Sequence, residues 1–225
     1  MSVAIIVPVY NEEKTLGTFL PLLEKFACDQ LIIVDGGSQD ASQARLKKQG
    51  ITWVQGRKGR AKQMNDGAAG CTSDVLLFLH VDTQLPPRAI EFIQIAMQDR
   101  TTVGGRFDVR LDGKEPVFRL IETLINWRSR LSRISTGDQA MFVRRHVFER
   151  VGGFAEQALM EDIALSRCLK RHGKIACLRH TVTTSARRWQ YHGVMRTVLL
   201  MWRLRFLYWC GVNSNTLAAM YHDAR

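Results

Sequence analysis

Two apolar runs near the N-terminus constrain the fold of this chain most. Residues 3–9 and 31–34 are rich in Val and Ile and do not alternate with polar residues. Uninterrupted runs of this kind are typical of strands that are buried on both faces. A carboxylate follows each run, Glu12 after the first and Asp35 after the second. Because ligands of open α/β sheets bind outside the carboxyl ends of such strands, the two ends predict the floor of a nucleotide site.

The first hundred residues continue as alternating strands and helices. We expect strands near 3–9, 30–35, 51–55 and 74–81, and helices near 14–27, 40–49, 60–70 and 86–99. This order predicts an α/β fold whose mostly parallel central sheet is flanked by crossover helices.

The regular alternation of strands and helices changes after about residue 102. Here we expect strands at 103–111, 138–144 and 175–184, and helices at 116–131, 159–172 and 191–210. No linker-like stretch interrupts the chain. We therefore expect a single domain over 1–225, with a nucleotide-binding half over about 1–100, an acceptor-binding and catalytic half over about 101–190, and a helical tail over about 191–225.

Composition favours a folded intracellular protein. The chain is 46% hydrophobic and 24% charged, and it has too little Gly and Pro for a disordered or fibrous protein. Its five cysteines are scattered, odd in number and not spaced like metal ligands. We expect reduced, mostly buried thiols in a cytoplasmic protein, and we see no secretory leader.

The charge of the chain is strongly positive and uneven. The net charge is +11, and residues 175–225 contain seven Arg, no Lys and one acid, Asp223. Such a surface attracts nucleic acid, anionic lipid or phosphorylated ligands, although a solubilising surface is the ordinary explanation. The basic stretch 57–65 has no aromatic residues for base stacking, which disfavours nucleic acid as the partner.

The apolar tail is long enough to suggest a membrane span over 194–212. However, Arg196, Arg203 and Arg205 interrupt it, and each would cost about 2.5–3.5 kcal/mol at mid-span. We therefore expect a helix that packs on the core. The sharper alternative is peripheral contact with the inner face of the membrane through the C-terminal helix.

A third apolar run ends in His80 and Asp82. In a strand, residues two apart share a face, so we expect both side chains to point the same way at the carboxyl end. A hard divalent cation often takes one or two carboxylates together with substrate phosphates, which suits Asp82. His80 is either a second ligand or a hydrogen-bond donor to the nucleotide. An Asp after a strand is also common as a simple turn residue.

Two further motifs carry chemistry. Glu161 and Asp162 stand at the start of a predicted helix, where acids favour the helix dipole, or where one of them serves as a general base. Arg187, Arg188 and Trp189 form a group that could clamp a diphosphate and stack on a sugar or base. The ordinary alternative for the second motif is a surface Arg pair beside a core Trp.

Together these motifs resemble family 2 glycosyltransferases of the GT-A fold. Residues 8–12 (PVYNE) are similar to the opening motif of that family, and residues 34–40 (VDGGSQD) to its second motif. Asp82 lies where the last acid of the family's D-x-D motif falls, and residues 161–162 are similar to its E-D motif. The resemblance covers roughly residues 3–190. The short length, the LHVDT form and the SARRW segment suggest a small bacterial subgroup.

The resemblance implies a role for each matching residue. Asp162 would be the catalytic base of an inverting transfer, and Asp82 would hold Mn²⁺ or Mg²⁺ against the diphosphate. The nucleotide sugar would lie among Pro8, Tyr10, Glu12, Asp35, Ser38, Arg60, Asn65, His80, Arg187 and Arg188. The donor sugar and acceptor would lie among Asp138, Gln139, Glu161 and Trp189.

Two departures from the family pattern stand out. His80 replaces the first acid of the D-x-D motif, and Gly36 stands where many relatives have a second Asp. The Q-x-x-R-W motif of processive synthases is absent in that form, so we expect no polymer synthesis.

The implied activity is metal-dependent, inverting transfer of a sugar from a nucleotide-diphosphate sugar to a hydroxyl acceptor, either a sugar or a lipid-linked molecule. Three alternatives stay open. They are a sugar-phosphate nucleotidyltransferase, a basic module that binds nucleic acid or anionic membrane, and a degenerate transferase without turnover.

Overall fold

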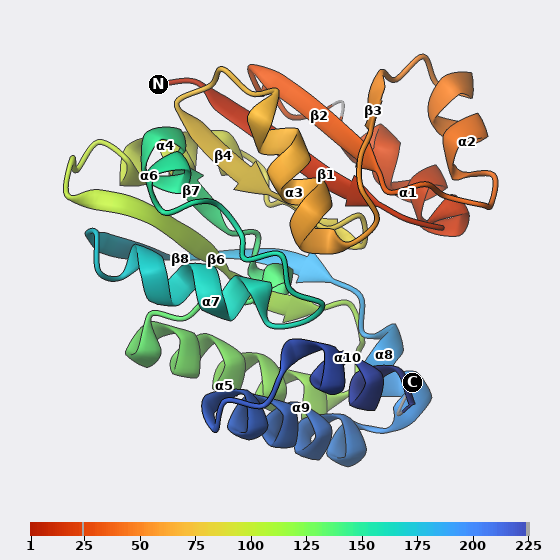
Figure 1. The fold of residues 1–225 in the computed structure, drawn as a ribbon, viewed down its shortest axis with the longest axis vertical. Coiled ribbons are helices and arrows are strands. Elements are labelled where there is room, and N and C mark those ends of the chain that lie inside the picture. The colour runs from red at the N-terminus through yellow and green to blue at the C-terminus, as the bar shows by residue number, and fades with distance from the viewer. Residues whose placement is uncertain (24, 224–225) are drawn as a thin grey trace.

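The computed structural model describes residues 1–23 and 25–223. Within these residues the chain forms an eight-stranded mixed sheet in the order β3-β2-β1-β4-β7-β6-β8-β5, with helices on both faces (Figure 1). The parallel part holds β1 (Val3–Val9), β2 (Gln30–Asp35), β3 (Trp53–Gln55) and β4 (Val75–Phe78). The helices of this half are α1 (Glu13–Leu23), α2 (Ser42–Lys48), α3 (Arg60–Ala69) and α4 (Ala89–Ala96).

The second half extends the sheet beyond β4. Its strands are β5 (Thr83–Gln84), β6 (Thr102–Leu111), β7 (Phe142–Arg144) and β8 (Lys174–Thr184). Strand β7 runs antiparallel to β4 and β6, β5 runs antiparallel to β8, and β6 runs parallel to β8. Its helices are α5 (Pro116–Ser132), α6 (Arg145–Arg150), α7 (Glu161–Leu169), α8 (Arg187–His192), α9 (Val194–Trp209) and α10 (Ser214–Asp223). The expected α/β sheet is confirmed, and it is mixed rather than purely parallel.

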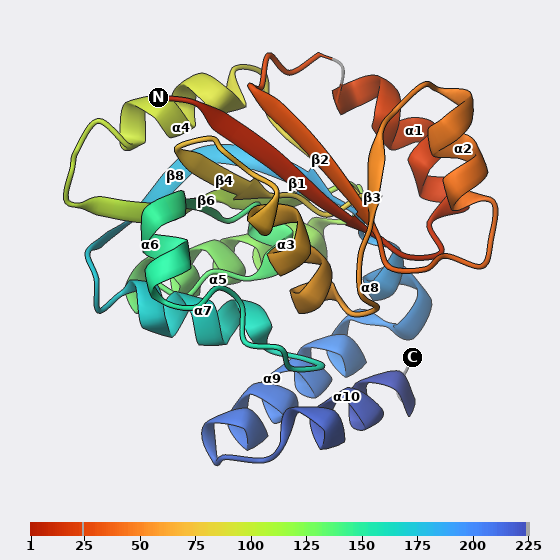
Figure 2. The same ribbon diagram turned by 45° about the horizontal axis from the view of Figure 1, so that its top comes forward.

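The core explains why the first strands lack alternation. Val3, Ile5 and Val7 pack against α1 and α4 on one face, whereas Ala4 and Ile6 pack against α3, α6 and α7 on the other. Both faces of β1 are therefore buried, as the uninterrupted run predicts. Figure 2 shows α3, α6 and α7 on the near side of the sheet and α4 behind it.

Two local predictions are wrong. Strand β4 ends at Phe78, so His80 and Asp82 lie in a turn, in which the Thr83 amide donates to the His80 carbonyl at 3.0 Å. The argument from strand alternation therefore does not apply to them. Asp138 lies in a short 3₁₀ turn, Gly137–Gln139, because Thr136 and Gln139 cap that turn reciprocally, and the strand begins only at Phe142.

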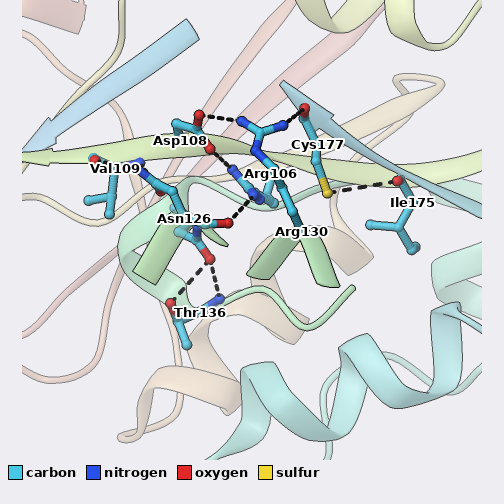
Figure 3. A network of polar contacts seen from close by, with 9 residues as sticks. Arg106, Asp108, Val109, Asn126, Arg130, Thr136, Ile175 and Cys177 are labelled. Carbon is cyan, nitrogen blue, oxygen red and sulfur yellow. Dashed lines mark hydrogen bonds and ion pairs between the residues drawn. The ribbon is translucent and has the colours of Figure 1, made fainter. Parts of the chain in front are cut away.

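A polar network fixes α5 against the sheet. Asp108 on β6 accepts hydrogen bonds from Arg106 and from Arg130 of α5, and Arg130 also donates to the Cys177 carbonyl at 3.1 Å (Figure 3). Asn126, one turn earlier, exchanges two hydrogen bonds with the backbone of Val109. Helix α5 is thus held at two points along its length.

The tail forms a separate layer at the lower end of the molecule (Figure 1). Leu204 of α9 and Leu217 of α10 pack against Met160 and Ile163 at the start of α7. Among the described residues, no helix has both the length and the apolar character to cross a bilayer.

All five cysteines are free, but only Cys71 is buried, so the expectation of mostly buried thiols is wrong.

Candidate functional site

The acid pair begins α7, as predicted. Met160 caps the helix in the left-handed region with φ 67°, and Glu161 and Asp162 occupy the first turn. The two carboxylates differ in their contacts. Asp162 accepts hydrogen bonds from the amides of Gly137 at 2.9 Å and Ile163 at 2.7 Å. Glu161 is almost fully buried. Asp162 is thus held in place by the backbone of two separate segments.

The environment of the pair keeps both carboxyls protonated to a higher pH than usual. Burial, and then the charge of Asp162, raise the pKa of Glu161 to about 7. Burial also raises the pKa of Asp162, against the effect of its two backbone hydrogen bonds. A general base works best when its pKa lies near the working pH, so the shift suits that role.

Arg60 connects this pair to the strand ends. It is the first residue of α3, and its Nη1 lies 3.7 Å from Oε1 of Glu161. Its side chain is half-exposed, and it also feels the charges of Asp162 and Asp82. Arg60 therefore stands between the predicted base and the predicted metal ligand.

Asp35 organises the loop after β2. Its Oδ1 accepts hydrogen bonds from the amides of Gly37 and Ser38 and from Nε2 of Gln43, and its Oδ2 accepts one from the Ser38 hydroxyl at 2.5 Å. Ser38 in turn accepts a hydrogen bond from the Asn11 amide at 2.9 Å. Asp35 is completely buried. The two motifs at the strand ends are thereby tied together.

The packing around position 36 explains why this chain has a glycine there. Gln63 of α3 donates from Nε2 to the carbonyls of Val9 at 2.7 Å and Val34 at 2.9 Å, and its side chain is buried. A Cβ atom at position 36 would lie 2.9 Å from Cδ of this pinned side chain. The glycine therefore makes room for a glutamine that joins the ends of β1 and β2.

The other residues of the first motif line the same edge. Pro8 and Tyr10 are half-buried, and Nζ of Lys58 lies 4.7 Å from the centre of the Tyr10 ring. Burial raises the pKa of Glu12, and a hydrogen bond with the Thr15 side chain opposes this effect. The charges that act on Glu12 belong to Asp82, Arg187 and Arg60, so it neighbours all three.

Asp82 is exposed, and the Thr83 hydroxyl lies 3.4 Å from its Oδ1, so most of the carboxylate is available to a ligand. The described residues contain no group of three or more His, Cys, Asp or Glu that could hold a metal ion. One carboxylate beside open space suits a divalent cation that takes its remaining ligands from substrate phosphates and water. Asp82 therefore fits a metal that binds together with a diphosphate.

His80 packs against the turn that contacts Asp162. A Cβ atom at position 137 would lie 2.4 Å from Cε1 of the His80 ring, so only glycine fits there. The same Gly137 donates its amide hydrogen to Asp162. Asp138 of this turn accepts a hydrogen bond from the Thr136 hydroxyl, and Gln139 is fully buried with Oε1 receiving the Thr136 amide at 3.2 Å.

Two predicted contact residues serve the scaffold. Asn65 exchanges hydrogen bonds with the backbone of Phe154 at 2.8 and 2.9 Å, which fixes the loop before α7. Trp189 packs into a small cluster with Phe118 and Ile121 of α5. Arg187 is exposed, and its Nε donates to the Ser185 hydroxyl at 3.0 Å. The side chain of Arg188 lies outside the described part of the structure.

The structure adds site residues that the sequence reasoning missed. Arg128 of α5 feels the charges of Asp138 and Asp162, and also that of Arg205 on α9. Tyr221 of α10 lies in the electrostatic neighbourhood of Arg60. In the sequence, Arg205 stood out as one of the arginines that interrupt the apolar tail, but nothing there connected it with Arg128 or Tyr221.

Comparison with known proteins decides the family. The model of "Glycosyl transferase family 2" matches residues 4–155, which is more than half of the chain. The chain belongs to glycosyl transferase family 2. The matched segment contains the strand-end motifs and Asp82, and it ends just before the acid pair.

The curated relatives of this family-2 chain are bacterial. It is 27% identical over 166 residues to the undecaprenyl-phosphate 4-deoxy-4-formamido-L-arabinose transferase of Aeromonas hydrophila, which covers 65% of the chain and 50% of the relative. It is 35% identical over 103 residues to the protein of that name from Pseudomonas fluorescens, with 39% and 30% covered. The chain spans about half the length of the first of these relatives.

Solved structures share the fold. The mannosyltransferase PcManGT of Pyrobaculum calidifontis, in complex with GDP-Man and Mn²⁺, matches with a TM-score of 0.68 and 19% identity, covering 90% of this chain and 60% of that one. TarS of S. aureus in complex with UDP-GlcNAc matches with a TM-score of 0.66 and 16% identity, covering 88% of this chain and 65% of TarS. At these identities the likeness concerns the fold alone.

Proposed function

We propose that this chain transfers a sugar from a nucleotide-diphosphate sugar to an acceptor hydroxyl, with inversion at the anomeric carbon. The observation that carries the proposal is the position of Asp162. Two backbone amides hold it at the start of α7, burial raises its pKa, and Arg60 links it to the strand ends. Family membership and the nucleotide sugars bound by PcManGT and TarS support a nucleotide-sugar donor.

In this proposal the chain's residues divide the work between donor and acceptor. Pro8, Tyr10 and the loop that Asp35 and Ser38 shape receive the base and ribose. Arg60 and Arg187 lie beside the diphosphate and offset the charge that develops on it. Asp162 takes the proton from the acceptor hydroxyl as its oxygen attacks the anomeric carbon.

A divalent cation completes the donor site. Asp82 is the residue that would hold Mn²⁺ or Mg²⁺, with Glu12 close by. When bound, the cation stabilises negative charge on the leaving diphosphate. PcManGT contains Mn²⁺ in its complex with GDP-Man, which is consistent with metal use here.

The acceptor side lies towards the tail. The curated relatives are named for transfer to undecaprenyl phosphate, a lipid-linked acceptor. In this chain α9 exposes an apolar stripe at helical spacing that comprises Met195, Leu199, Trp202, Phe206 and Trp209. Arg196 and Arg203 flank it, and α8 and α9 contain no acidic residue. This pattern is typical of a helix that lies on an anionic membrane surface, and we assign that role to it.

The basic stretch 57–65 supports an enzyme over a nucleic-acid module. Arg57 pairs with Asp66 and Glu156, and Lys58 covers Tyr10. These cations are thus engaged within the protein rather than presented as a free patch.

The donor is the first point to test. Thermal shift against a panel of nucleoside diphosphates with Mn²⁺ should show stabilisation by one base above the others, and the matching nucleotide sugar should be turned over. Proton NMR of the first-formed product should show the inverted anomer. If no nucleoside diphosphate stabilises the protein, the proposal fails; a retained anomer would refute the inverting mechanism.

A further inference from the structure

Arg128 on α5 carries two buried nitrogens that lack a hydrogen-bond partner among residues 1–23 and 25–223. These atoms are Nε and Nη2, which form one edge of the guanidinium group. This edge presents two parallel N–H donors, the arrangement that matches the oxygens of a phosphate or carboxylate. The unused donors are therefore arranged as a fork for an anion.

A second cation stands beside it. Arg205 of α9 repels Arg128, and together with burial, which is the larger effect, it lowers the pKa of Arg128 to about 10. Both side chains are half-buried, and neither takes part in an ion pair within the described residues. Bringing two guanidinium groups together away from full solvent is costly, so their placement indicates a ligand of opposite charge.

The helix that carries Arg128 is held in place. Asn126 and Arg130, two residues before and after Arg128, are the side chains that anchor α5 to β6 and β8 (Figure 3). The position of the guanidinium is therefore fixed by the scaffold, which is the condition for a specific binding site.

The charged groups of the site follow one another in a definite order. Arg128 neighbours Asp138 and Asp162, Asp162 neighbours Arg60, and Arg60 neighbours Asp82. Glu12 neighbours Asp82 and Arg187. Arg128 and Arg205 thus belong to the end near Asp162, and Asp82 and Arg187 to the other.

We propose that Arg128 and Arg205 bind an anionic group of the acceptor, a phosphate or a carboxylate, beside Asp162. This rests on the proposed function, because it names the acceptor class of the same site. The donor diphosphate occupies the opposite end, with Asp82 and Arg187. An acceptor anchored by its anion presents its attacking oxygen to Asp162.

The test measures inorganic phosphate binding by calorimetry while the donor site is saturated with the nucleoside diphosphate that stabilises the protein best. The wild type should bind phosphate under these conditions. Arg128→Gln and Arg205→Gln should each weaken binding by about tenfold or more, since a charged, forked contact is lost. Arg128→Lys should recover part of the affinity, and Arg150→Gln, which changes an exposed arginine on α6, should leave it unchanged.

Folding is monitored in parallel. Because the Arg128 side chain forms no ion pair and its Nε and Nη2 have no hydrogen-bond partner among the described residues, Arg128→Gln should melt at the wild-type temperature or above it. Further titrations with glucose 6-phosphate and farnesyl phosphate separate a soluble acceptor from a lipid one, and dependence on Arg128 in either supports the subsite. Equal phosphate affinity in wild type and Arg128→Gln would overturn the subsite, as would displacement of phosphate by the nucleotide.

The two proposals fail separately. Absence of nucleoside diphosphate binding in the wild type contradicts the proposed function, and phosphate titrated without nucleotide then still tests Arg128. Normal donor binding with an unchanged phosphate affinity in both variants contradicts the subsite alone.

Discussion

The amide of Gly137 donates a hydrogen bond to Asp162 at 2.9 Å, although 25 residues separate them in the chain. The His80 ring packs on the same glycine, where a side chain would clash. The residue that departs from the D-x-D pattern thus contacts the turn that positions the predicted base. Where the family pattern has an acid, this chain has His80, whose imidazole packs on Gly137.

Asp162→Asn should keep donor binding and lose transfer by about 10²–10⁴-fold, because the amide keeps the size of the side chain but cannot take a proton. Nucleotide-sugar affinity by calorimetry and nucleoside diphosphate release measure the two effects. Asp74→Asn, a surface change away from the site, is the control and should be fully active. Substantial turnover by Asp162→Asn would remove this residue from the role of base.

Glu161→Gln should stabilise the protein at neutral pH. The pKa of Glu161 is raised to about 7 in the folded state, so the unfolded chain, with its ordinary pKa of 4.5, binds fewer protons between these values. The ionised Glu161 carboxylate therefore does not destabilise the folded state below about pH 4. Its destabilising effect reaches its full size above about pH 7. The gain should therefore grow across that window to about 3 kcal/mol.

Urea denaturation of Glu161→Gln and wild type at pH 4, 5.5 and 7.5 measures this difference. Glu149→Gln, an exposed glutamate on α6, should show no such trend. A constant difference across the three pH values would contradict a raised pKa at Glu161.

Asp82→Ala should abolish the effect of Mn²⁺ on donor binding. The described residues offer no cluster of three ligands, so Mn²⁺ alone should bind weakly and should bind tightly only with a nucleoside diphosphate. Calorimetry with metal, nucleotide and both together resolves this coupling. Tight binding of Mn²⁺ to the free protein, or normal coupling in the variant, would contradict a metal site at Asp82.

Gly36→Ala should destabilise the chain by about 1–3 kcal/mol, since the new Cβ would press on Gln63. In the double variant Gly36→Ala/Gln63→Ala the cost should be less than the sum of the two single changes. Thermal or urea unfolding of all three variants measures the coupling. Gly70→Ala, whose Cβ would meet its nearest atom at 3.9 Å, is the neutral control, and strictly additive effects would exclude the contact.

The variant Trp202→Glu/Phe206→Glu should lose binding to vesicles that contain anionic phospholipid. These side chains are 65% and 60% exposed, so the fold should survive. Flotation with anionic and with neutral vesicles at low and high salt measures binding, and wild type should prefer the anionic vesicles at low salt. Ile95→Glu, at a site 58% exposed on α4, should bind as wild type does. Equal flotation of all three proteins would rule out this surface.

The parallel half of the fold could be predicted from the sequence because its central strands, β1 and β4, are buried on both faces. Val3–Val9 and Gln30–Asp35 form strands at the expected positions. The ends of elements were harder to predict. The run 74–81 stays apolar beyond Phe78, but the chain turns there, and hydrophobicity carries no signal of that turn. The two-residue strand β5 was not predicted, because it is defined by its pairing with β8.

The candidate site was predictable where a motif is local, and hidden where it depends on packing. The pair at 161–162 starts a helix as expected. The approach of Arg60 to Glu161 joins residues about a hundred positions apart, and only the fold reveals it. Arg128 gave no signal, because an arginine on an amphipathic helix is ordinarily a surface residue. The role we propose for it rests on two nitrogens that lack a hydrogen-bond partner among the described residues, which a sequence cannot show.

The contact between Gly36 and Gln63 has a consequence for variation among relatives. A chain with an acid at the position of Gly36 cannot keep a glutamine pinned across the ends of β1 and β2. The two positions are therefore expected to change together as lineages diverge. Sequences that break this correlation must have found another way to join the two strand ends.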